Sequence, residues 1–213
     1  PGGLVAATES LIDYLHSMYG DNIRAIVPQL SMSGGTLLAL SCKEILMGNE
    51  SSLGPVDPQF GGMAAQSYLS EFEQACAEIK KDPSRLALWQ SILGKIQPGF
   101  LLTCQNAIDW SKEILINSLE QVMLKNDPNA EQKLEAIVKL FWDQSISKDH
   151  SRHINKEQAR QAGVNIIDLE ANDKLQDLVL SLHHLLCLTF QQTSAIKIIT
   201  SGLNKSYITH VNS

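Results

Sequence analysis

The chain has 213 residues, 44% of them hydrophobic, and carries 17 Lys and Arg against 23 Asp and Glu, for a formal net charge of −6. This length and composition are ordinary for one globular domain, and they exclude disorder and a collagen-like fibre. No block of basic residues could follow a phosphate backbone, and no run approaches the roughly 18 apolar residues of a membrane span, so nucleic acid and the membrane interior are not expected partners.

The first sixty residues predict helices that alternate with strands. Apolar residues recur at helical spacing over 3–19, and Gly20 suits the helix C-terminus. Residues 23–28 (IRAIVP) predict a short buried strand, a polar and small stretch covers 29–35, and 36–40 predict a buried helix. Residues 45–47 predict the next strand. This alternation indicates an α/β fold with a parallel sheet.

After Pro55 and Pro58 the pattern becomes mainly helical. Helices are predicted over 63–80, 83–93, 98–125, 130–145, 156–162 and 173–191, and strands over 164–167 and 196–199. We therefore expect a single domain, 1–213, with an α/β catalytic core (1–60), a helical segment (61–150) and a C-terminal segment of helix and edge strand (151–213).

The four cysteines lie far apart and form no CxxC pair: Cys42, Cys76, Cys104 and Cys187. A tight framework of the kind that small secreted domains use is therefore not expected. We predict free, mostly buried thiols.

The strongest candidate for chemistry is Ser33, in the run Ser31-Met32-Ser33-Gly34-Gly35. This run follows a predicted strand and opens the predicted buried helix. A serine at such a turn presents its hydroxyl at the sheet edge, beside the free N–H groups of the helix N-terminus, as an acyl-transfer nucleophile requires. The alternative is that Ser31 or Ser33 merely caps the helix.

A second glycine pair, Gly2-Gly3, follows Pro1 and opens the first predicted helix. If the two helix starts face one pocket, the amides of Gly2 or Gly3 and of Gly34 together form an oxyanion hole, usually worth about 3–4 kcal/mol per donor. The alternative is an ordinary tight turn.

Three segments taken together resemble a known family: PGGLVAA (1–7), MSGGTLLALSCKEILMG (32–48) and SSLGPVDPQ (51–59). Their order and spacing are similar to those of the serine dehydrogenase proteinase family, related to signal peptide peptidase A within the ClpP/crotonase superfamily. A weaker similarity continues through Lys95, 101–119 and 157–164. The resemblance implies a spiral of βαβ units with a helical C-terminal part, and we expect leading strands to be missing from the front of this chain.

The resemblance also implies roles for individual residues. Ser33 would be the nucleophile at a helix N-terminus, Gly2, Gly3 and Gly34 would surround the oxyanion, and a substrate peptide would lie as an added strand. ClpP takes its base from a histidine shortly after the nucleophile, and this chain has no histidine between His16 and His150. The signal-peptide-peptidase branch instead uses a desolvated lysine.

Three lysines lie at a suitable distance after Ser33. Lys80 and Lys81 precede Asp82, which predicts a solvated helix end. Lys95 has apolar neighbours and resembles the position of the family lysine, so we expect it to be the base. The alternative is a lysine that extends into solvent from a loop.

The remaining candidates favour structural roles. His150 and His153 are three residues apart and do not form the HExxH pattern of a zinc site. His183 and His184 are adjacent on a predicted helix, so their side chains cannot both point into one binding site. We predict no metal and no cofactor. Asp57, between two prolines, either turns the chain or orients a group in a pocket, and the turn is favoured.

The function that these observations favour is that of a serine peptidase, with a Ser33–Lys95 dyad and a backbone oxyanion hole. A non-catalytic ClpP-like assembly protein is the main alternative. A crotonase-like acyl-CoA enzyme is less favoured, because it would need a catalytic carboxylate and would leave Ser33 unexplained. We expect a peptide or protein substrate, a homo-oligomer and a cytoplasmic location, with membrane association only through a segment upstream of this chain.

Overall fold

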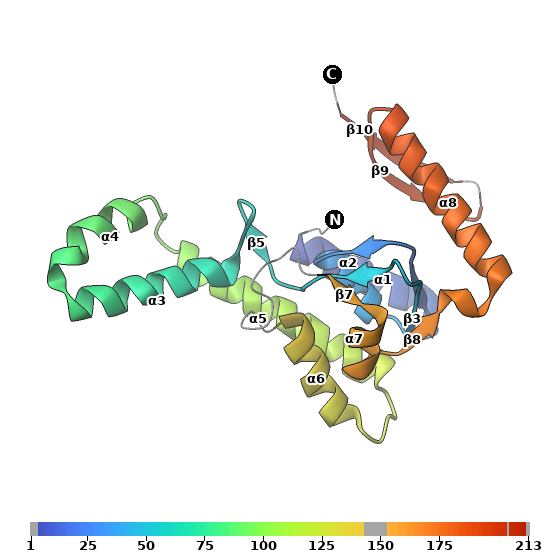
Figure 1. Ribbon diagram of the computed structural model, residues 1–213, viewed down its shortest axis with the longest axis horizontal. Coiled ribbons are helices and arrows are strands. Elements are labelled where there is room, and N and C mark those ends of the chain that lie inside the picture. The colour runs from blue at the N-terminus through green and yellow to red at the C-terminus, as the bar shows by residue number, and fades with distance from the viewer. Residues whose placement is uncertain (1–3, 143–152, 204, 212–213) are drawn as a thin grey trace. The chain divides into compact units, whose positions relative to one another are not determined.

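The computed structural model describes residues 4–142, 153–203 and 205–211 (Figure 1). The chain divides into two compact units, Pro1–Asp168 and Leu169–Ser213. The helices and strands of the first unit are α1 (Val5–Tyr19), β1 (Arg24–Val27), β2 (Leu30–Ser31), α2 (Gly34–Leu40), β3 (Glu44–Met47), β4 (Ser52–Leu53), β5 (Gln59–Phe60), β6 (Met63–Ala64), α3 (Ala65–Lys81), α4 (Leu86–Leu93), α5 (Phe100–Ser118), α6 (Ala130–Trp142), β7 (Ile154–Asn155), α7 (Lys156–Gln161) and β8 (Ile166–Asp168).

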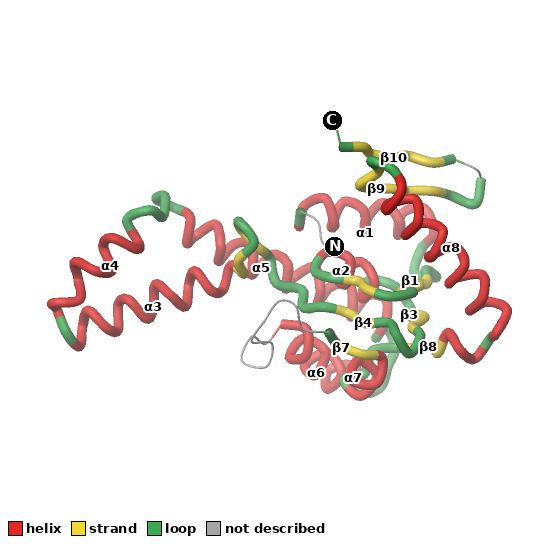
Figure 2. The backbone as a smooth tube through the Cα atoms, turned by 45° about the horizontal axis from the view of Figure 1, so that its top comes forward, coloured by secondary structure: helices red, strands yellow, loops and turns green. Residues whose placement is uncertain are grey.

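The predicted α/β class is confirmed, with helices packed around small sheets (Figure 2). One sheet has the order β1-β3-β8 and is parallel throughout. A second sheet has the order β2-β4-β7, in which β2 and β4 are parallel and β7 is antiparallel to β4. Strands β5 and β6 form a hairpin. The spiral of βαβ units stays a prediction.

The hydrophobic core lies where α2, α5 and α6 pack together with the central strand β3. The largest fully buried apolar side chains of these elements are Leu37, Leu40, Ile45, Met47, Leu115, Ile137 and Phe141. Each such side chain contributes about 1.5–3 kcal/mol when it leaves water. The predicted buried helix over 36–40 is confirmed as α2, and its burial anchors the turn that precedes it.

The first strand differs from its prediction. The sequence predicts a buried strand over 23–28, but β1 is at the edge of its sheet, Ile26 is 45% exposed and only Val27 of β1 is buried. A β-branched run indicates a strand without indicating whether neighbours cover both of its faces.

Helices α3 and α4 form a hairpin that projects from the rest of the first unit, beyond the start of α5 (Figure 1). Where α3 begins, it packs against α5 through Ala65, Cys104 and Ile108. The rings of Phe60 and Tyr68 meet that of Phe100 edge to face, with centroids 5.5 and 4.9 Å apart. Farther out, several large apolar side chains are exposed: Phe72, Leu86, Leu88 and Ile92.

Two predicted helices are less regular than expected. The helix predicted over 98–125 is α5, which ends at Ser118 and continues as a π-helical turn, Leu119–Met123. The helix predicted over 83–93 begins with a 3-10 turn, Pro83–Arg85, whose N-cap Asp82 accepts a hydrogen bond from the backbone of Ser84. All four cysteines are free, but Cys76 is exposed and Cys187 half-buried, so the prediction of mostly buried thiols holds only for Cys42 and Cys104.

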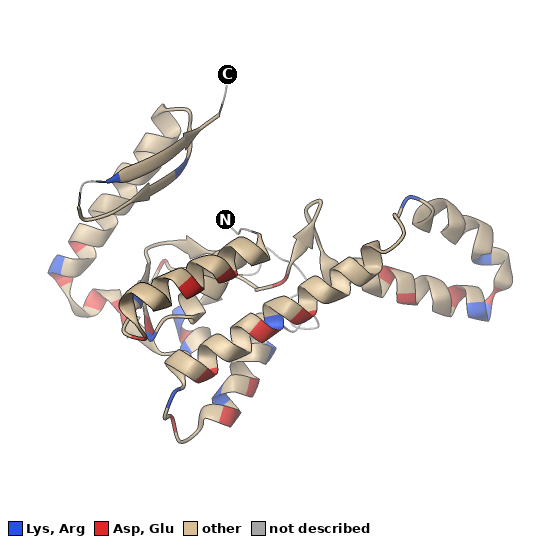
Figure 3. Ribbon diagram, turned by 180° about the vertical axis from the view of Figure 1, so that it is seen from behind, with Lys and Arg blue, Asp and Glu red and all other residues tan. Residues whose placement is uncertain are grey.

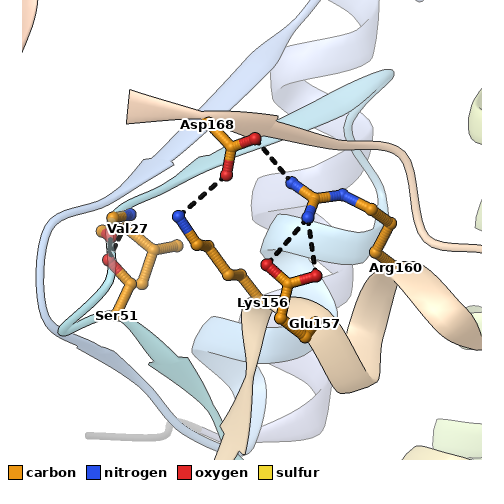
Figure 4. Close-up of polar contacts among 7 residues, drawn as sticks. Val27, Ser51, Lys156, Glu157, Arg160 and Asp168 are labelled. Carbon is orange, nitrogen blue, oxygen red and sulfur yellow. Dashed lines mark hydrogen bonds and ion pairs between the residues drawn. The ribbon is translucent and has the colours of Figure 1, made fainter. Parts of the chain in front are cut away.

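A cluster of charged side chains joins α7 to β8 (Figure 4). The carboxylate of Asp168 accepts hydrogen bonds from Lys156 Nζ at 2.8 Å and from Arg160 Nη2 at 2.9 Å. Arg160 also donates to Glu157. Hydrogen bonds from Lys156 and Arg160 lower the pKa of Asp168. The predicted helix over 156–162 is thereby held against the predicted strand over 164–167.

The second unit consists of a 3-10 turn (Leu169–Ala171), α8 (Asp173–Gln192) and an antiparallel hairpin of β9 (Ala195–Thr200) and β10 (Ser206–His210). The sequence does not predict β10. The Asp and Lys residues of α8 lie at its start (Figure 3), and none of its residues is buried. Leu178, Leu182 and Leu185 are each more than half exposed.

None of the helices in the described ranges is both long enough and apolar enough to cross a lipid bilayer.

Candidate functional site

Ser33 stands in a sharp turn between a strand and a helix. Strand β2 ends at Ser31 and α2 begins at Gly34, and Ser33 between them has φ 49° and ψ −118°. A non-glycine residue at positive φ costs about 1–3 kcal/mol and persists only where its surroundings hold it. Strained residues of this kind concentrate at active sites, and a nucleophilic serine at a strand-to-helix turn has its hydroxyl exposed by the strain.

The structure gives no support to the alternative that Ser33 merely caps the helix. The side chain of Ser33 makes no capping hydrogen bond to the backbone of α2. Its hydroxyl therefore does not satisfy the N–H groups of the helix start.

Neighbouring backbone holds this turn in place. The N–H of Ser33 donates to the carbonyl oxygen of Pro55 at 3.2 Å. The fully buried hydroxyl of Thr36 donates to the carbonyl of Ser31 at 2.7 Å and accepts from the N–H of Gly54 at 3.2 Å. The two motifs that carry the family resemblance, around 32–36 and 52–59, are therefore in direct contact.

Gly54 packs closely against Met32. A Cβ at Gly54 would lie 2.3 Å from the Sδ atom of Met32, so the end of the Met32 side chain would have to move, whereas the 3.4 Å to the Cα of Met32 is an ordinary contact. The segment after β4 thus passes against the residue before Ser33.

Ser33 and Gly34 open onto a pocket of about 820 Å³. Its walls come from the start of α1, the Ser33 turn, the segment after β4 and one face of α5. The lining residues are Leu4, Val5, Ala6, Thr8, Ser33, Gly34, Leu37, Val56, Asp57, Pro58, Gln59, Phe60, Thr103, Asn106, Ala107, Trp110 and Ser111. The walls from α1 and α5 are tied by Trp110, whose Nε1 donates to Glu9 at 3.0 Å.

Of the three glycines predicted to surround the oxyanion, the structure describes Gly34. Gly34 lines the pocket beside Ser33, at the first position of α2, where backbone N–H groups have no partner within the helix. Gly2 and Gly3 lie outside the described residues. Leu4 and Val5, which follow them, line the same pocket.

The structure does not bring the predicted base to Ser33 within one chain. Lys95 lies between α4 and α5, is exposed, and lines a separate pocket together with Glu71 and Phe100. Within the described residues of the single chain, Lys95 is therefore not buried as a desolvated base would be. Lys80 and Lys81 are exposed in the last turn of α3, as predicted for a solvated helix end. Neither Lys nor His occurs among the described residues that line the Ser33 pocket.

His16 and His153 of the first unit do not line the Ser33 pocket. Nδ1 of His153 lies 2.9 Å from Ser52 Oγ, and His16 Nε2 lies 3.0 Å from the carbonyl oxygen of Ser41. His150 lies outside the described residues. Within the described ranges, no three His, Cys, Asp or Glu side chains come together as metal ligands would.

Sequence reasoning missed one part of the pocket and gave the other only second place. Asp57, for which a turn was favoured over a role in a pocket, is 8% exposed and lines the pocket as its one charged residue among those described. A face of α5 also contributes Thr103, Asn106 and Trp110. Their spacing of three and four residues is a helical periodicity that the sequence contains, whereas the burial of Asp57 has no local signature.

Comparison with known proteins places the sequence of this chain in a family. A family model described as ClpP-like SDH-type serine proteinase matches residues 1–179, which include Ser33, Asp57 and Lys95. The chain is 32% identical over 166 residues to the uncharacterized protein MJ0137 of Methanocaldococcus jannaschii, covering 78% of this chain and 50% of that protein. It is 40% identical over 72 residues to the uncharacterized protein MJ1495 of the same organism, covering 34% of this chain and 24% of that protein.

The match to MJ0137 thus spans half of that relative's length, and no solved structure matches the chain significantly. The family match covers most of the chain and agrees with the resemblance carried by its three motifs. The chain therefore belongs to the ClpP-like SDH-type serine proteinase family.

Proposed function

We propose that this protein is a serine proteinase in which Ser33 is the nucleophile. The observation that carries the proposal is the strained, uncapped Ser33 at the start of α2, opening onto a pocket in a chain of a proteinase family. Ser33 Oγ attacks the carbonyl carbon of a peptide bond and loses its proton to a base. The amine then leaves with a proton, and water hydrolyses the ester that remains.

The backbone around Ser33 suits a developing oxyanion and an extended substrate. We propose that the amide of Gly34, with those of Gly2 and Gly3, stabilises the oxyanion. Strand β2 is an edge strand of its sheet and ends two residues before Ser33. A peptide that pairs with this edge as an added strand is thereby led to the hydroxyl.

We propose Lys95 as the base, with Lys80 and Lys81 as alternatives. Because Lys95 lines a different pocket from Ser33 in one chain, it must reach Ser33 from a second copy of the chain or by movement of the α3–α4 hairpin. The exposed apolar side chains of this hairpin, including Leu86 and Leu88, support a homo-oligomer that covers them.

A second candidate is a non-catalytic assembly protein of the same fold. The observation that favours it is the lack of Lys and His among the described residues lining the Ser33 pocket. In that case Ser33 would stay unreactive in an intact fold.

The proposal is tested by comparing the hydrolysis rates of the wild type and the Ser33→Ala variant. Fluorescent casein serves as the protein substrate and p-nitrophenyl acetate as the ester substrate. We expect the variant to lose at least about 10³-fold in kcat, as when a serine nucleophile is removed. Ser31→Ala is the matched control, because Ser31 lies two residues away and does not line the pocket. Hydrolysis at the wild-type rate by Ser33→Ala would contradict the proposal.

A further inference from the structure

Thr36 carries a buried hydroxyl in the first turn of α2. The residue has a relative exposure of 0%. A threonine hydroxyl inside a helix ordinarily donates to a carbonyl three or four residues earlier. The hydroxyl of Thr36 instead donates to the carbonyl of Ser31, five residues earlier, at 2.7 Å. This hydrogen bond therefore runs from the start of the helix back to the end of β2, across the turn that contains Ser33.

The N–H of Gly54 contacts both groups of this hydrogen bond. It donates to the carbonyl of Ser31 at 2.8 Å and to Thr36 Oγ1 at 3.2 Å. The Thr36 hydroxyl, the Ser31 carbonyl and the Gly54 N–H thus form a closed set of three hydrogen bonds. The set joins the start of α2, the end of β2 and the segment after β4.

These hydrogen bonds act on Ser33 because Ser33 lies between two of the joined residues. At φ 49° and ψ −118°, Ser33 has a conformation that a non-glycine residue leaves unless its surroundings hold it. The bond between Thr36 and Ser31 fixes the two sides of the turn to each other. While that bond is intact, the turn cannot relax by moving the helix start away from the strand.

The other hydrogen bonds at Ser33 come from the backbone. Its N–H donates to the carbonyl of Pro55 at 3.2 Å, and its carbonyl accepts from the N–H of Leu37 at 3.0 Å. A substitution of the Thr36 side chain removes neither of these bonds. The hydroxyl of Thr36 is therefore a restraint on the turn that a single substitution can test.

We propose that Thr36 is a positioning residue for the nucleophile, whose hydroxyl keeps Ser33 in the strained conformation that presents its Oγ to the pocket. Thr36 is not among the described residues that line the pocket, so it acts through Ser33 and not on the substrate. Misplacement of a reacting group by about 1 Å can slow a reaction about 100-fold. This inference rests on the proposed function, and it adds a residue to that site.

Two substitutions of Thr36 separate its hydroxyl from its methyl group. Thr36→Val replaces the hydroxyl by a methyl group of similar size, and Thr36→Ser keeps the hydroxyl. Single-turnover hydrolysis of p-nitrophenyl acetate, with protein in excess, gives the rate constant of acylation and the dissociation constant of the ester separately. We expect Thr36→Val to lower the rate constant at least about tenfold without changing the dissociation constant, and Thr36→Ser to restore it.

Ser41→Ala is the matched control. The hydroxyl of Ser41 is equally buried, with a relative exposure of 1% for the residue, and donates to the carbonyl of Leu38 at 2.7 Å at the other end of α2. We expect this variant to acylate at the wild-type rate. If Thr36→Val does not fold, Thr36→Ser and Thr36→Ala, which differ only in the hydroxyl, give the same comparison. Acylation at the wild-type rate by Thr36→Val, or equal rates for Thr36→Ser and Thr36→Ala, would overturn the inference.

A spectroscopic measurement keeps the inference independent of hydrolysis. In protein made with isotopically labelled serine, the Cα and Cβ chemical shifts of Ser33 depend on its φ and ψ, and the Ser33→Ala variant identifies its signals. We expect these shifts to change in Thr36→Val and Thr36→Ala and to be retained in Thr36→Ser and Ser41→Ala. The same pattern in a protein that hydrolyses nothing would support the restraint by Thr36 and sink the proposed function alone. Unchanged Ser33 shifts in a folded Thr36→Val or Thr36→Ala protein would overturn the inference.

Discussion

The backbone N–H of Ser33 donates to the carbonyl oxygen of Pro55 at 3.2 Å, and this bond joins the two sequence motifs on which the site depends. It continues the parallel pairing of β2 with β4, in which Leu30 faces Ser52 and Ser31 faces Leu53. The strained turn is therefore held by a buried neighbouring segment. The same segment brings Asp57 to the pocket.

The Ser33→Gly variant tests the backbone strain at this turn independently of the reactivity of the serine hydroxyl. At φ 49° and ψ −118° glycine pays no steric penalty, whereas serine does. Relief of the strain raises the free energy of unfolding, and the greater entropy of glycine in the unfolded chain lowers it. We therefore expect urea denaturation to give a free energy of unfolding that is unchanged or up to about 1 kcal/mol higher than that of the wild type. The same variant should be inactive. A loss of more than about 1 kcal/mol would mean that the Ser33 side chain stabilises the fold and that the turn is not strained.

Lys95→Met tests the proposed base, since methionine keeps an unbranched apolar side chain without an amine. We expect it to abolish hydrolysis, while Lys80→Met and Lys81→Met, in the exposed last turn of α3, keep activity. An active Lys95→Met protein would remove Lys95 from the mechanism without touching the role of Ser33.

Mixing inactive variants shows whether Lys95 acts across copies of the chain. If a second chain supplies the lysine, Ser33→Ala and Lys95→Met regain part of the activity when they are mixed and allowed to exchange subunits. Light scattering would show an oligomer in the same samples. A monomeric wild type with full activity would exclude supply of the base by a second chain.

Asp168→Asn tests the charged cluster that joins α7 to β8 (Figure 4). Since Asp168 is 43% exposed, solvent screens its ion pairs, and we expect a loss of about 0.5–1 kcal/mol at pH 7. Hydrogen bonds from Lys156 and Arg160 lower the pKa of Asp168 in the folded state. Its contribution is therefore present above the pKa that Asp168 has in the unfolded chain and is lost as pH falls through the folded value.

Thermal unfolding of wild type and Asp168→Asn between pH 7 and pH 2 measures this effect. The two melting temperatures should converge at the acidic end. Glu157→Gln, which removes a more exposed partner of Arg160, should cost less. A constant difference at every pH would show that Asp168 acts by packing.

Local sequence patterns were sufficient to predict the helices and the turn that precedes α2. The apolar spacing before Gly20 predicts α1 and its end, and in the structure Gly20 has φ 64°, a conformation that glycine adopts easily. The run after Gly34 predicts α2 because a short helix without charge must be buried. Strands β2, β4, β7 and the hairpin of β5 and β6 were not predicted, because two residues are too few to show a period.

Burial at the site depends on contacts that sequence neighbours do not reveal. Lys95 has apolar neighbours in the sequence, yet it is exposed because the segment between α4 and α5 is not covered by other elements of its unit. Asp57 shows the reverse, since a residue between two prolines resembles a surface turn, but Phe141 and Ala65 make hydrogen bonds to the backbone on either side of it, at Val56 and Pro58. Such long-range hydrogen bonds determine which of the candidate side chains share the pocket.

The central claim is that the hydroxyl of Ser33 is a nucleophile, and covalent labelling tests it most directly. The wild-type protein is treated with a fluorophosphonate probe, digested, and the modified residue identified by mass spectrometry. Ser111 is the internal control, because it lines the same pocket but its hydroxyl donates to the carbonyl of Ala107 at 2.9 Å within α5. We predict a stoichiometric label on Ser33 and none on Ser111. An unlabelled Ser33 in a folded protein would contradict the claim and favour the non-catalytic assembly protein.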